Sequence, residues 1–408
     1  MRILPRRTLS AVAATISVLG LLTIGPPAAS ASPSFYDPPS PLPAGANGDV
    51  IRHEASTFYI DPIKLLKADA SVQRIMYRST DTHGSPIAVT GTVLTPSASW
   101  LGLGPRPIIG YAVGTQGVGD DCAPSKALSA GFEYEGPFIE GLLARGYGVV
   151  VTDYEGLGTP GDHTYVNRAS QAHAVLDSIR AAQRLPEAGL PDSGPVAIAG
   201  YSQGGGASAA AAELQPSYAP ELKLKGAYAG AVPADLSAVA QNLDGHYAFG
   251  FLAFAMVSMN YAYPELNIPA LLNDQGKALF ERVRSECTVE AIAAHAFTQS
   301  STLTRDGRPV TAFLGEEPYR SKVMEQKIGS LKPTAPILIV HSALDDIVPY
   351  AQDRDLGRTW CGKGVNVRFS TTLVPTHVLG AVRAYPEAFA WLEGRFAGLP
   401  AVGNCGWF

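Results

Sequence analysis

The sequence has little charge and no excess of basic residues. Only 16% of its 408 residues are Asp, Glu, Lys or Arg, and the formal net charge is −5 at pH 7. Nucleic acids and anionic membranes attract basic surfaces, so this balance argues against both as electrostatic partners. With 46% hydrophobic residues and no internal repeat, the composition is typical of a globular protein with a large core. The length suits one large domain with an insertion, or two small domains.

The first 31 residues have the pattern of an export signal. Arg2, Arg6 and Arg7 precede an uncharged apolar stretch over 9–24, and Ala-Ser-Ala follows at 29–31. This pattern predicts cleavage after Ala31 and a secreted mature protein. The apolar stretch is short for a transmembrane anchor. The arginine pair leaves the twin-arginine export route as a minority alternative.

Cysteine is scarce, with four residues at Cys122, Cys287, Cys361 and Cys405. No two of them are close in sequence and no histidine is spaced to complete a ligand set, so we expect no metal site. An even number of cysteines in an exported chain predicts two disulfides, for which three pairings are possible. A bond between Cys361 and Cys405 would tie down the C-terminal tail. A bond between Cys122 and Cys287 would tie the core to the middle of the chain.

Apolar runs alternate with helical patterns along most of the chain, which predicts an α/β fold with a mostly parallel sheet between two layers of helices. The expected strands are 72–77, 87–94, 107–113, 146–153, 196–199, 225–231, 335–341 and 365–371. Between about 233 and 320 only helical patterns occur. We therefore expect a core formed by 49–232 and 321–408, a helical cap inserted at 233–320, and an extended mature N-terminus at 32–48.

A Gly-Tyr-Ser-Gln-Gly turn at 200–204 connects an apolar run to a helix of small residues. A G-x-S-x-G sequence between a strand and a helix is typical of the nucleophile elbow, a strained turn that exposes one serine hydroxyl. Gly200 and Gly204 allow neighbouring backbone to come close. Ser202 is therefore the predicted nucleophile. The alternative is a glycine-rich turn without chemistry.

A serine nucleophile needs a base and an acid that orients the base, and both follow in the expected order. Asp345 and Asp346 come after the apolar run 335–341, and His377 comes after the run 365–371. We predict that His377 is the base. The spacing His-x-x-x-Asp-x-x-Val-Pro favours Asp345 as the acid, with Asp346 bracing the turn. The other histidines, including His341, are expected to be structural.

Two backbone N–H groups are expected to form an oxyanion hole. One belongs to Gln203, directly after the predicted nucleophile. The other is expected in the loop Gly-Thr-Gln-Gly at 114–117, where we favour Gln116 over Thr115. A simple glycine-rich turn is the alternative for this loop.

The stretch from Phe249 to Met259 is apolar all round rather than on one stripe. It is either an ordinary buried helix or the lining of an acyl-binding tunnel. In the second interpretation, the substrate-binding residues are Phe251, Phe254, Ala255 and Met256.

Five motifs together resemble the secretory lipase family: Gly-Tyr-Ser-Gln-Gly-Gly at 200–205, Cys-Ala-Pro-Ser at 122–125, Asp-Tyr-Glu-Gly-Leu-Gly at 153–158, Leu-Asp-Asp-Ile-Val-Pro at 344–349 and Pro-Thr-His at 375–377. The resemblance covers nearly the whole mature chain. It implies an α/β-hydrolase core, a helical cap inserted after the sixth strand, and hydrolysis of triacylglycerols and other carboxylic esters without a cofactor. It also supports the disulfides Cys122–Cys287 and Cys361–Cys405. The loop at 114–117 departs from the family, which has an acidic residue there.

The predicted function is therefore a secreted lipase or esterase whose substrate is a lipid or another ester. Contact with a lipid–water interface is possible for such an enzyme, and the sequence assigns no oligomeric state. A secreted serine peptidase of the same fold is the first alternative, and it would need an anionic anchor such as Glu316 and Glu317 for a substrate amino group. A non-catalytic binding protein on a hydrolase scaffold is the second.

Overall fold

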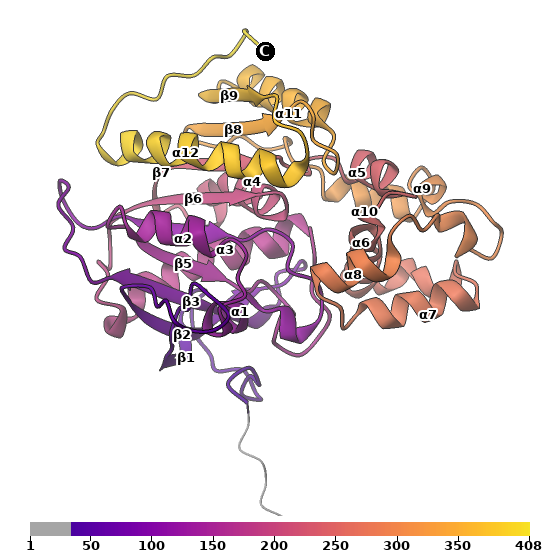
Figure 1. Ribbon diagram of the computed structural model, residues 1–408, viewed down its shortest axis with the longest axis horizontal. Coiled ribbons are helices and arrows are strands. Elements are labelled where there is room, and N and C mark those ends of the chain that lie inside the picture. The colour runs from indigo at the N-terminus through magenta and orange to yellow at the C-terminus, as the bar shows by residue number, and fades with distance from the viewer. Residues whose placement is uncertain (1–33) are drawn as a thin grey trace, which may run out of the picture. The chain divides into compact units, whose positions relative to one another are not determined.

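The computed structural model describes residues 34–408, so the expected export signal lies outside the described residues. The described part is built on a nine-stranded sheet with the order β1-β2-β3-β5-β4-β6-β7-β8-β9 (Figure 1). Strands β1 (Val50–Ala55), β2 (Ala70–Thr80) and β3 (Pro86–Pro96) are antiparallel. β3 also pairs antiparallel with β5 (Gly148–Thr152).

The rest of the sheet is parallel, as the alternating strand and helix patterns predicted. Its strands, besides β5, are β4 (Ile108–Ala112), β6 (Pro195–Tyr201), β7 (Lys223–Gly230), β8 (Ile337–Ser342) and β9 (Val367–Thr372). Every residue of β4, β5 and β8 is buried, because helices cover both faces of the sheet.

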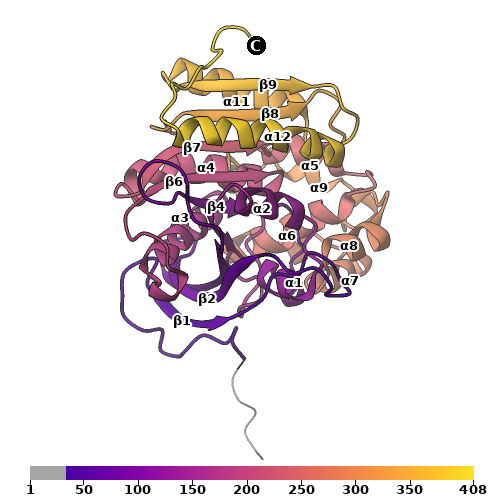
Figure 2. The same cartoon turned by 60° about the vertical axis from the view of Figure 1, so that its left-hand side comes forward.

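The helices form one layer on each face of the sheet (Figures 1 and 2). One layer contains α3 (Arg168–Arg184), α4 (Gln203–Tyr218) and α11 (Tyr350–Gly362). The other contains α1 (Pro124–Ala130), α2 (Gly136–Leu143) and α12 (His377–Phe396). The rings of Phe138 and Tyr385 stack at 3.5 Å between α2 and α12.

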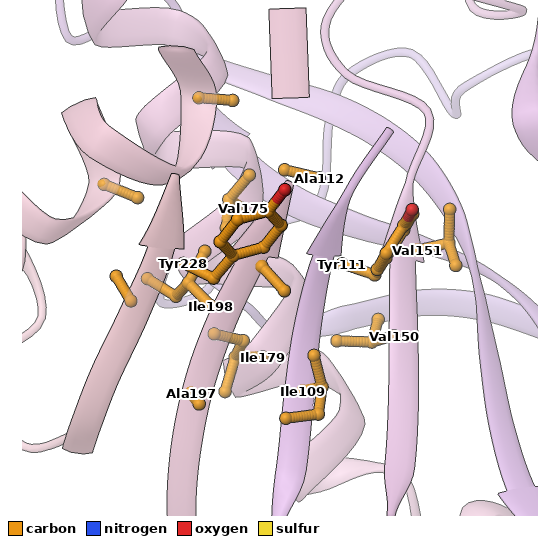
Figure 3. Close-up of a cluster of buried hydrophobic side chains, with 14 of the residues drawn as sticks. Ile109, Tyr111, Ala112, Val150, Val151, Val175, Ile179, Ala197, Ile198 and Tyr228 are labelled. Atoms are coloured by element: carbon orange, nitrogen blue, oxygen red, sulfur yellow. The ribbon is translucent and has the colours of Figure 1, made fainter. Parts of the chain in front are cut away.

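The core packs α3 directly onto the central strands (Figure 3). Val175 and Ile179 of α3 point at the sheet beside Ile109 and Ile198. A Cβ at Gly110 of β4 would lie 2.7 Å from the Cδ1 of Ile179, so a larger residue there would displace that side chain. The strand β4, which pairs with the nucleophile strand β6, is thus closely packed against α3.

Helices fill the segment between β7 and β8, and none of its residues joins the sheet. They are α5 (Leu236–Leu243), α6 (Phe249–Ala262), α7 (Asp274–Val283), α8 (Thr288–His295), α9 (Val310–Phe313) and α10 (Tyr319–Glu325). They form their own hydrophobic cluster beside the ends of the parallel strands (Figure 1). The helical run continues to Glu325, five residues past the expected 320.

The expected α/β class is confirmed, and both expected disulfides are present, Cys122–Cys287 and Cys361–Cys405. The insertion follows the seventh strand in chain order instead of the sixth, because β1 forms from residues whose pattern did not indicate a strand. The sequence also missed α11. In residues 34–408, no helix has the length and apolar character needed to cross a membrane.

Candidate active site

Ser202 lies on a sharp turn between β6 and α4, as the elbow pattern predicted. Its φ of 60° and ψ of −124° are strained for a residue with a side chain. A Cβ at Gly200 would lie 2.3 Å from the carbonyl oxygen of Gly204, and a Cβ at Gly204 would lie 2.0 Å from that of Ala112. Only glycine fits at both positions, so the turn that presents the serine depends on them.

Asp345 and His377 meet at the carboxyl end of the sheet. Asp345 follows β8 and His377 begins α12, and the Nδ1 of His377 lies 2.7 Å from the Oδ2 of Asp345. The carboxylate therefore fixes the tautomer with hydrogen on Nδ1 and leaves Nε2 as the basic nitrogen. Asp345 itself is held by the N–H groups of Ile347 and Val348, at 2.9 and 2.8 Å from its Oδ1.

Asp346 holds the backbone of His377 instead of its ring. Its Oδ1 accepts a hydrogen bond from the N–H of His377 at 2.8 Å, and its Oδ2 accepts one from the hydroxyl of Tyr247 at 3.0 Å. On the other side, the Tyr201 hydroxyl donates to the carbonyl of His377 at 3.0 Å. Ser202 follows Tyr201 directly. The contacts of His377 with Asp346 and with Tyr201 therefore hold it near the serine. Among residues 34–408, the Ser202 hydroxyl has no hydrogen-bond partner, which is common in unliganded active sites.

Gln203 begins α4, so its backbone N–H is one of the helix's unpaired first donors. Its side chain is held away from the site: Nε2 donates to the Nε2 of His163 at 3.1 Å, while the Nδ1 of His163 donates to the carbonyl of Glu155 at 2.7 Å. Burial lowers the pKa of His163 to about 4. This histidine is therefore neutral and can accept from Gln203 at every pH at which the protein is expected to work.

Two buried glutamates hold the loop at 114–117. The N–H of Gly114 donates to the Oε2 of Glu135 at 2.7 Å, and the Nε2 of Gln116 donates to the Oε1 of Glu133 at 3.1 Å. Burial raises the pKa of Glu133 to about 8 and that of Glu135 to about 7. The Gln116 side chain is thus turned into the protein, and its backbone carbonyl accepts from the N–H of Thr288 at 3.0 Å.

Thr115 lies at the centre of that loop and faces both the core and the insertion. Its carbonyl accepts hydrogen bonds from the Tyr134 hydroxyl at 3.1 Å and from the Oγ1 of Thr288 at 2.7 Å. Its own hydroxyl lies 2.9 Å from that of Tyr165, which lines a cavity together with Ser202. Thr115 thus contacts a residue of the cavity lining, whereas the Gln116 side chain bonds to the buried Glu133.

Two adjoining cavities lie between the elbow and the insertion. The first is lined by Ser202, Gln203 and apolar side chains. The second lies among the helices of the insertion alone and has an almost entirely apolar lining. Four residues line both cavities: Leu236, Ala240, Leu252 and Ala255. An apolar path therefore leads from the serine into the insertion.

The predicted acyl-site residues divide between these cavities. Phe251 lines the first, Met256 the second and Ala255 both. Phe254 lines neither; it is fully buried, and its ring centroid is 5.9 Å from that of Tyr165. Part of the helix α6 is therefore buried in the core of the insertion, and part of it lines the cavities.

Sequence reasoning missed the polar residues Glu133 and Glu135, and Asp353, whose Oδ2 lies 2.9 Å from the Nδ1 of His341. It expected His163 and His341 to be structural. It gave Tyr201 no role, although Tyr201 lies within the elbow motif. Of the described residues, no group of three His, Cys, Asp or Glu side chains is arranged to hold a metal ion.

Comparison with known proteins points to one family. The family described as secretory lipase matches residues 123–404. The chain belongs to the secretory lipase family. Lipase 5 of Candida albicans is 31% identical over 402 residues, which cover 93% of this chain and 83% of that lipase. A probable inactive lipase of Mycobacterium tuberculosis is also 31% identical, over 90% of this chain and 82% of the relative.

A solved structure agrees with the sequence relatives. Candida antarctica lipase A in its closed state superposes with a TM-score of 0.81 at 27% identity, covering 91% of this chain and 87% of the lipase. The fold is therefore that of an α/β-hydrolase, and this secretory lipase is a carboxylic ester hydrolase.

Proposed function

We propose that this secretory lipase cleaves its ester through an acyl-enzyme on Ser202. The observation that carries the proposal is the 2.7 Å contact between His377 and Asp345 beside the strained elbow. His377 takes the proton of the Ser202 hydroxyl as the oxygen attacks the ester carbonyl. It then gives that proton to the leaving alcohol, and the same groups activate water for deacylation.

The developing oxyanion needs two donors. We assign the first to the N–H of Gln203, at the positive end of α4. The second comes from the backbone of the loop at 114–117, where the inward turn of Gln116 toward Glu133 makes Thr115 at least as well placed as Gln116. The buried glutamates leave this loop no freedom to relax, which is what a preorganised oxyanion hole requires.

The acyl group of the substrate is proposed to occupy the apolar path under the insertion, so that the helices at 233–320 act as its cap. Each methylene buried there contributes about 0.8 kcal/mol. The second cavity is lined almost entirely by carbon, which suits a hydrocarbon chain and offers no anchor for a polar group. These features support a lipid ester, including triacylglycerol, as the substrate.

The active site is bordered by exposed apolar side chains, which we call the apolar rim: Leu344, Leu373, Val378, Leu379 and Val382. Leu344 contacts the turn before His377, because its carbonyl accepts from the N–H of Thr376 at 3.2 Å. From Leu373 to Val382 the only ionisable residue is His377, which is buried. An uncharged rim beside the catalytic histidine suits the surface of a neutral ester aggregate.

We propose that the mature enzyme is exported and cleaved after Ala31. Two disulfides and the secretory family support an extracellular site of action. N-terminal sequencing of the secreted protein tests the cleavage position, and a mature N-terminus other than Ser32 would refute it.

The peptidase alternative is less well supported, because its expected anionic anchors already have cationic partners. Glu316 pairs with Arg308 at 2.6 Å and Glu317 pairs with Arg320 at 2.7 Å. The acidic pair after β8 is likewise engaged by His377. One relative, from Mycobacterium tuberculosis, is named a probable inactive lipase. The experiment below therefore also tests the non-catalytic alternative.

The test is a hydrolysis profile on p-nitrophenyl esters from two to sixteen carbons, with one peptide amide as control, for the native enzyme and for Ser202→Ala. We expect ester turnover, no amide turnover, and a loss on the order of a million-fold in the variant. A purified, folded Ser202→Ala protein that keeps a tenth of the native rate would refute the nucleophile. An inactive native enzyme would favour the binding protein.

A further inference from the structure

His341 lies between two carboxylates in the interior behind the catalytic pair. It stands near the end of β8, and its side chain and those of Asp345 and Asp353 are fully shielded from solvent. Its Nε2 is 3.2 Å from the Oδ2 of Asp345, and its Nδ1 is 2.9 Å from the Oδ2 of Asp353 on α11. The same oxygen of Asp345 accepts from His377, so one carboxylate oxygen joins two imidazoles.

The surroundings of Asp345 determine which protons are present. Its Oδ1 accepts two backbone N–H groups, and its Oδ2 faces two histidine nitrogens. An ionised carboxylate has about four acceptor positions, and here all are used. The Nε2 of His341 therefore carries hydrogen and donates to the carboxylate.

The second nitrogen of His341 faces another carboxyl group. The Oδ2 of Asp353 accepts the N–H of Val232 at 2.8 Å, and burial raises the pKa of Asp353 against the opposing charge of His341. Burial alone would lower the pKa of His341, but the charges of Asp353 and Asp345 outweigh it and raise the pKa to about 9. Burial would raise the pKa of Asp345, yet its hydrogen bonds from His341 and His377 hold it well below the usual range.

We propose that His341 is a positioning residue of this enzyme: as a buried imidazolium between Asp345 and Asp353, it keeps the carboxylate that orients His377 ionised and fixed. The proposal rests on the proposed triad and adds a second histidine to it. Without the cation, two carboxylates would share a site without water, and one of them would take up a proton. A protonated Asp345 would no longer hold His377 in its catalytic tautomer.

The remaining ionisable groups around His341 come from three elements. They are Tyr350 of α11, whose ring centroid is 5.5 Å away, Tyr201 of β6 and His377 of α12. Burial raises the pKa of Tyr201 above the range in which the enzyme works. Within this cluster, the group expected to titrate in the alkaline range is therefore His341; Glu133, with a pKa of about 8, belongs to the loop at 114–117.

The sign of the pH dependence follows from the raised pKa. The folded value of about 9 exceeds the ordinary histidine value near 6.5, so the stabilisation is complete below about pH 6.5 and disappears as the pH rises through 9. Activity should fall over the same upper range, because the carboxylate loses its cation.

The experiment compares pH profiles of kcat and KM for native enzyme and His341→Gln, which keeps an amide donor but no charge. We expect a kcat at least tenfold lower at pH 8 with KM little changed. Loss of the cation also changes the electrostatic field at the catalytic pair, so the acid limb of kcat/KM should move to a different pH. The native decline near pH 9 should be absent from the variant.

His295→Gln is the matched control, because His295 is buried against Glu286 at 2.7 Å in the insertion, away from Asp345. For His295→Gln, the acid and alkaline limbs of the pH profile, where activity declines, should lie at the same pH values as in the native enzyme. Unchanged limbs in a folded His341→Gln protein would overturn the inference. They would leave the triad standing, because Ser202→Ala tests that separately.

A measurement on the native protein covers the case in which His341→Gln does not fold. With ¹⁵N-labelled histidine, one buried histidine should show both ring nitrogens protonated up to pH 8, and Asp353→Asn should shift those two signals. If every histidine were singly protonated at pH 8, the inference would be wrong.

Discussion

The two sides of the candidate active site are built on opposite principles. On the sheet side, hydrogen bonds hold the acid and the base: Asp345 alone accepts from two backbone N–H groups and two imidazoles. On the side of the insertion, Ala255, Met256 and Leu252 line a path with almost no polar atoms. The first side specifies atom positions within tenths of an ångström, and the second specifies only a volume.

This difference separates chemistry from selectivity. A hydrogen-bonded carboxylate is intolerant of change, because removal of one donor or acceptor leaves a buried polar group unpaired. An apolar lining tolerates changes of shape, and its changes alter which substrates fit. Substitutions on the sheet side should therefore affect all esters alike, and substitutions in the insertion should discriminate among them.

The largest contrast is expected within the sheet side, between Asp345→Asn and Asp346→Asn. Asparagine at 345 would favour the wrong tautomer of His377 and should lower kcat by about 10⁴, as found for the equivalent acid of serine proteases. Asparagine at 346 keeps the oxygen that accepts the N–H of His377, so its kcat should fall less than tenfold. Steady-state kinetics on one short and one long ester measures both.

The interpretation of this comparison requires that each variant lose the same fraction of kcat on the short and on the long ester. If Asp345→Asn discriminated between the short and the long ester, the acid would have a role in substrate fit that its buried position does not explain. If Asp346→Asn were the more damaging variant, the assignment of the acid would have to be exchanged.

The chemistry of the sheet side was predictable from the sequence because each reactive group lies in a local motif. The elbow at 200–204 needs glycine for steric reasons that act within five residues. The choice of Asp345 over Asp346 also followed from spacing, and it is supported by the contact of each residue with His377.

Most supporting contacts were not predictable, because they join residues far apart in sequence; His341 is only four residues from Asp345, but their spacing did not indicate a contact. His341 was expected to be structural, since a histidine before the acid has no place in the triad's chain order. Its partner Asp353 lies on α11, which the sequence did not indicate. The apolar stretch at 249–259 shows the same limit: its composition predicts burial, but which residues line the cavities depends on packing against α5, α7 and α8.

A smaller and more selective effect is expected from Ala255→Trp. Ala255 lines both cavities, so an indole there should block the path between them. At about 0.8 kcal/mol per buried methylene, kcat/KM for a twelve-carbon ester should fall at least about a hundredfold, and that for a four-carbon ester less than about threefold. Met256→Trp, which narrows only the second cavity, should affect only the longer chains.

Ala294→Trp is the control for this comparison, because Ala294 is exposed on α8 and lines neither cavity. It should leave the chain-length profile unchanged. Equal losses on short and long esters for Ala255→Trp, or a collapse of its melting temperature, would make the helix α6 purely structural and refute the acyl path.

The smallest effect is expected at the apolar rim, which touches neither the chemistry nor the acyl path. Leu373→Asp combined with Val382→Asp places charge on the surface that we assign to a neutral ester aggregate. Hydrolysis of an emulsified triacylglycerol should fall about thirtyfold, since the two lost apolar contacts together weaken adsorption by about 2 kcal/mol. Hydrolysis of a dissolved short-chain ester should not change.

Leu399→Asp combined with Val402→Asp gives the matched comparison, because both side chains are exposed and apolar but belong to the C-terminal tail. If this pair lowered emulsion activity as much as the rim pair does, adsorption would depend on general surface hydrophobicity, and the rim would have no special part in it. If sedimentation showed a native dimer that the rim substitutions dissociate, the rim would be a contact between two copies of the chain. If activity fell only for the rim pair and only on the emulsion, the apolar rim would select aggregated over dissolved ester. The insertion, by contrast, would select the length of the acyl chain.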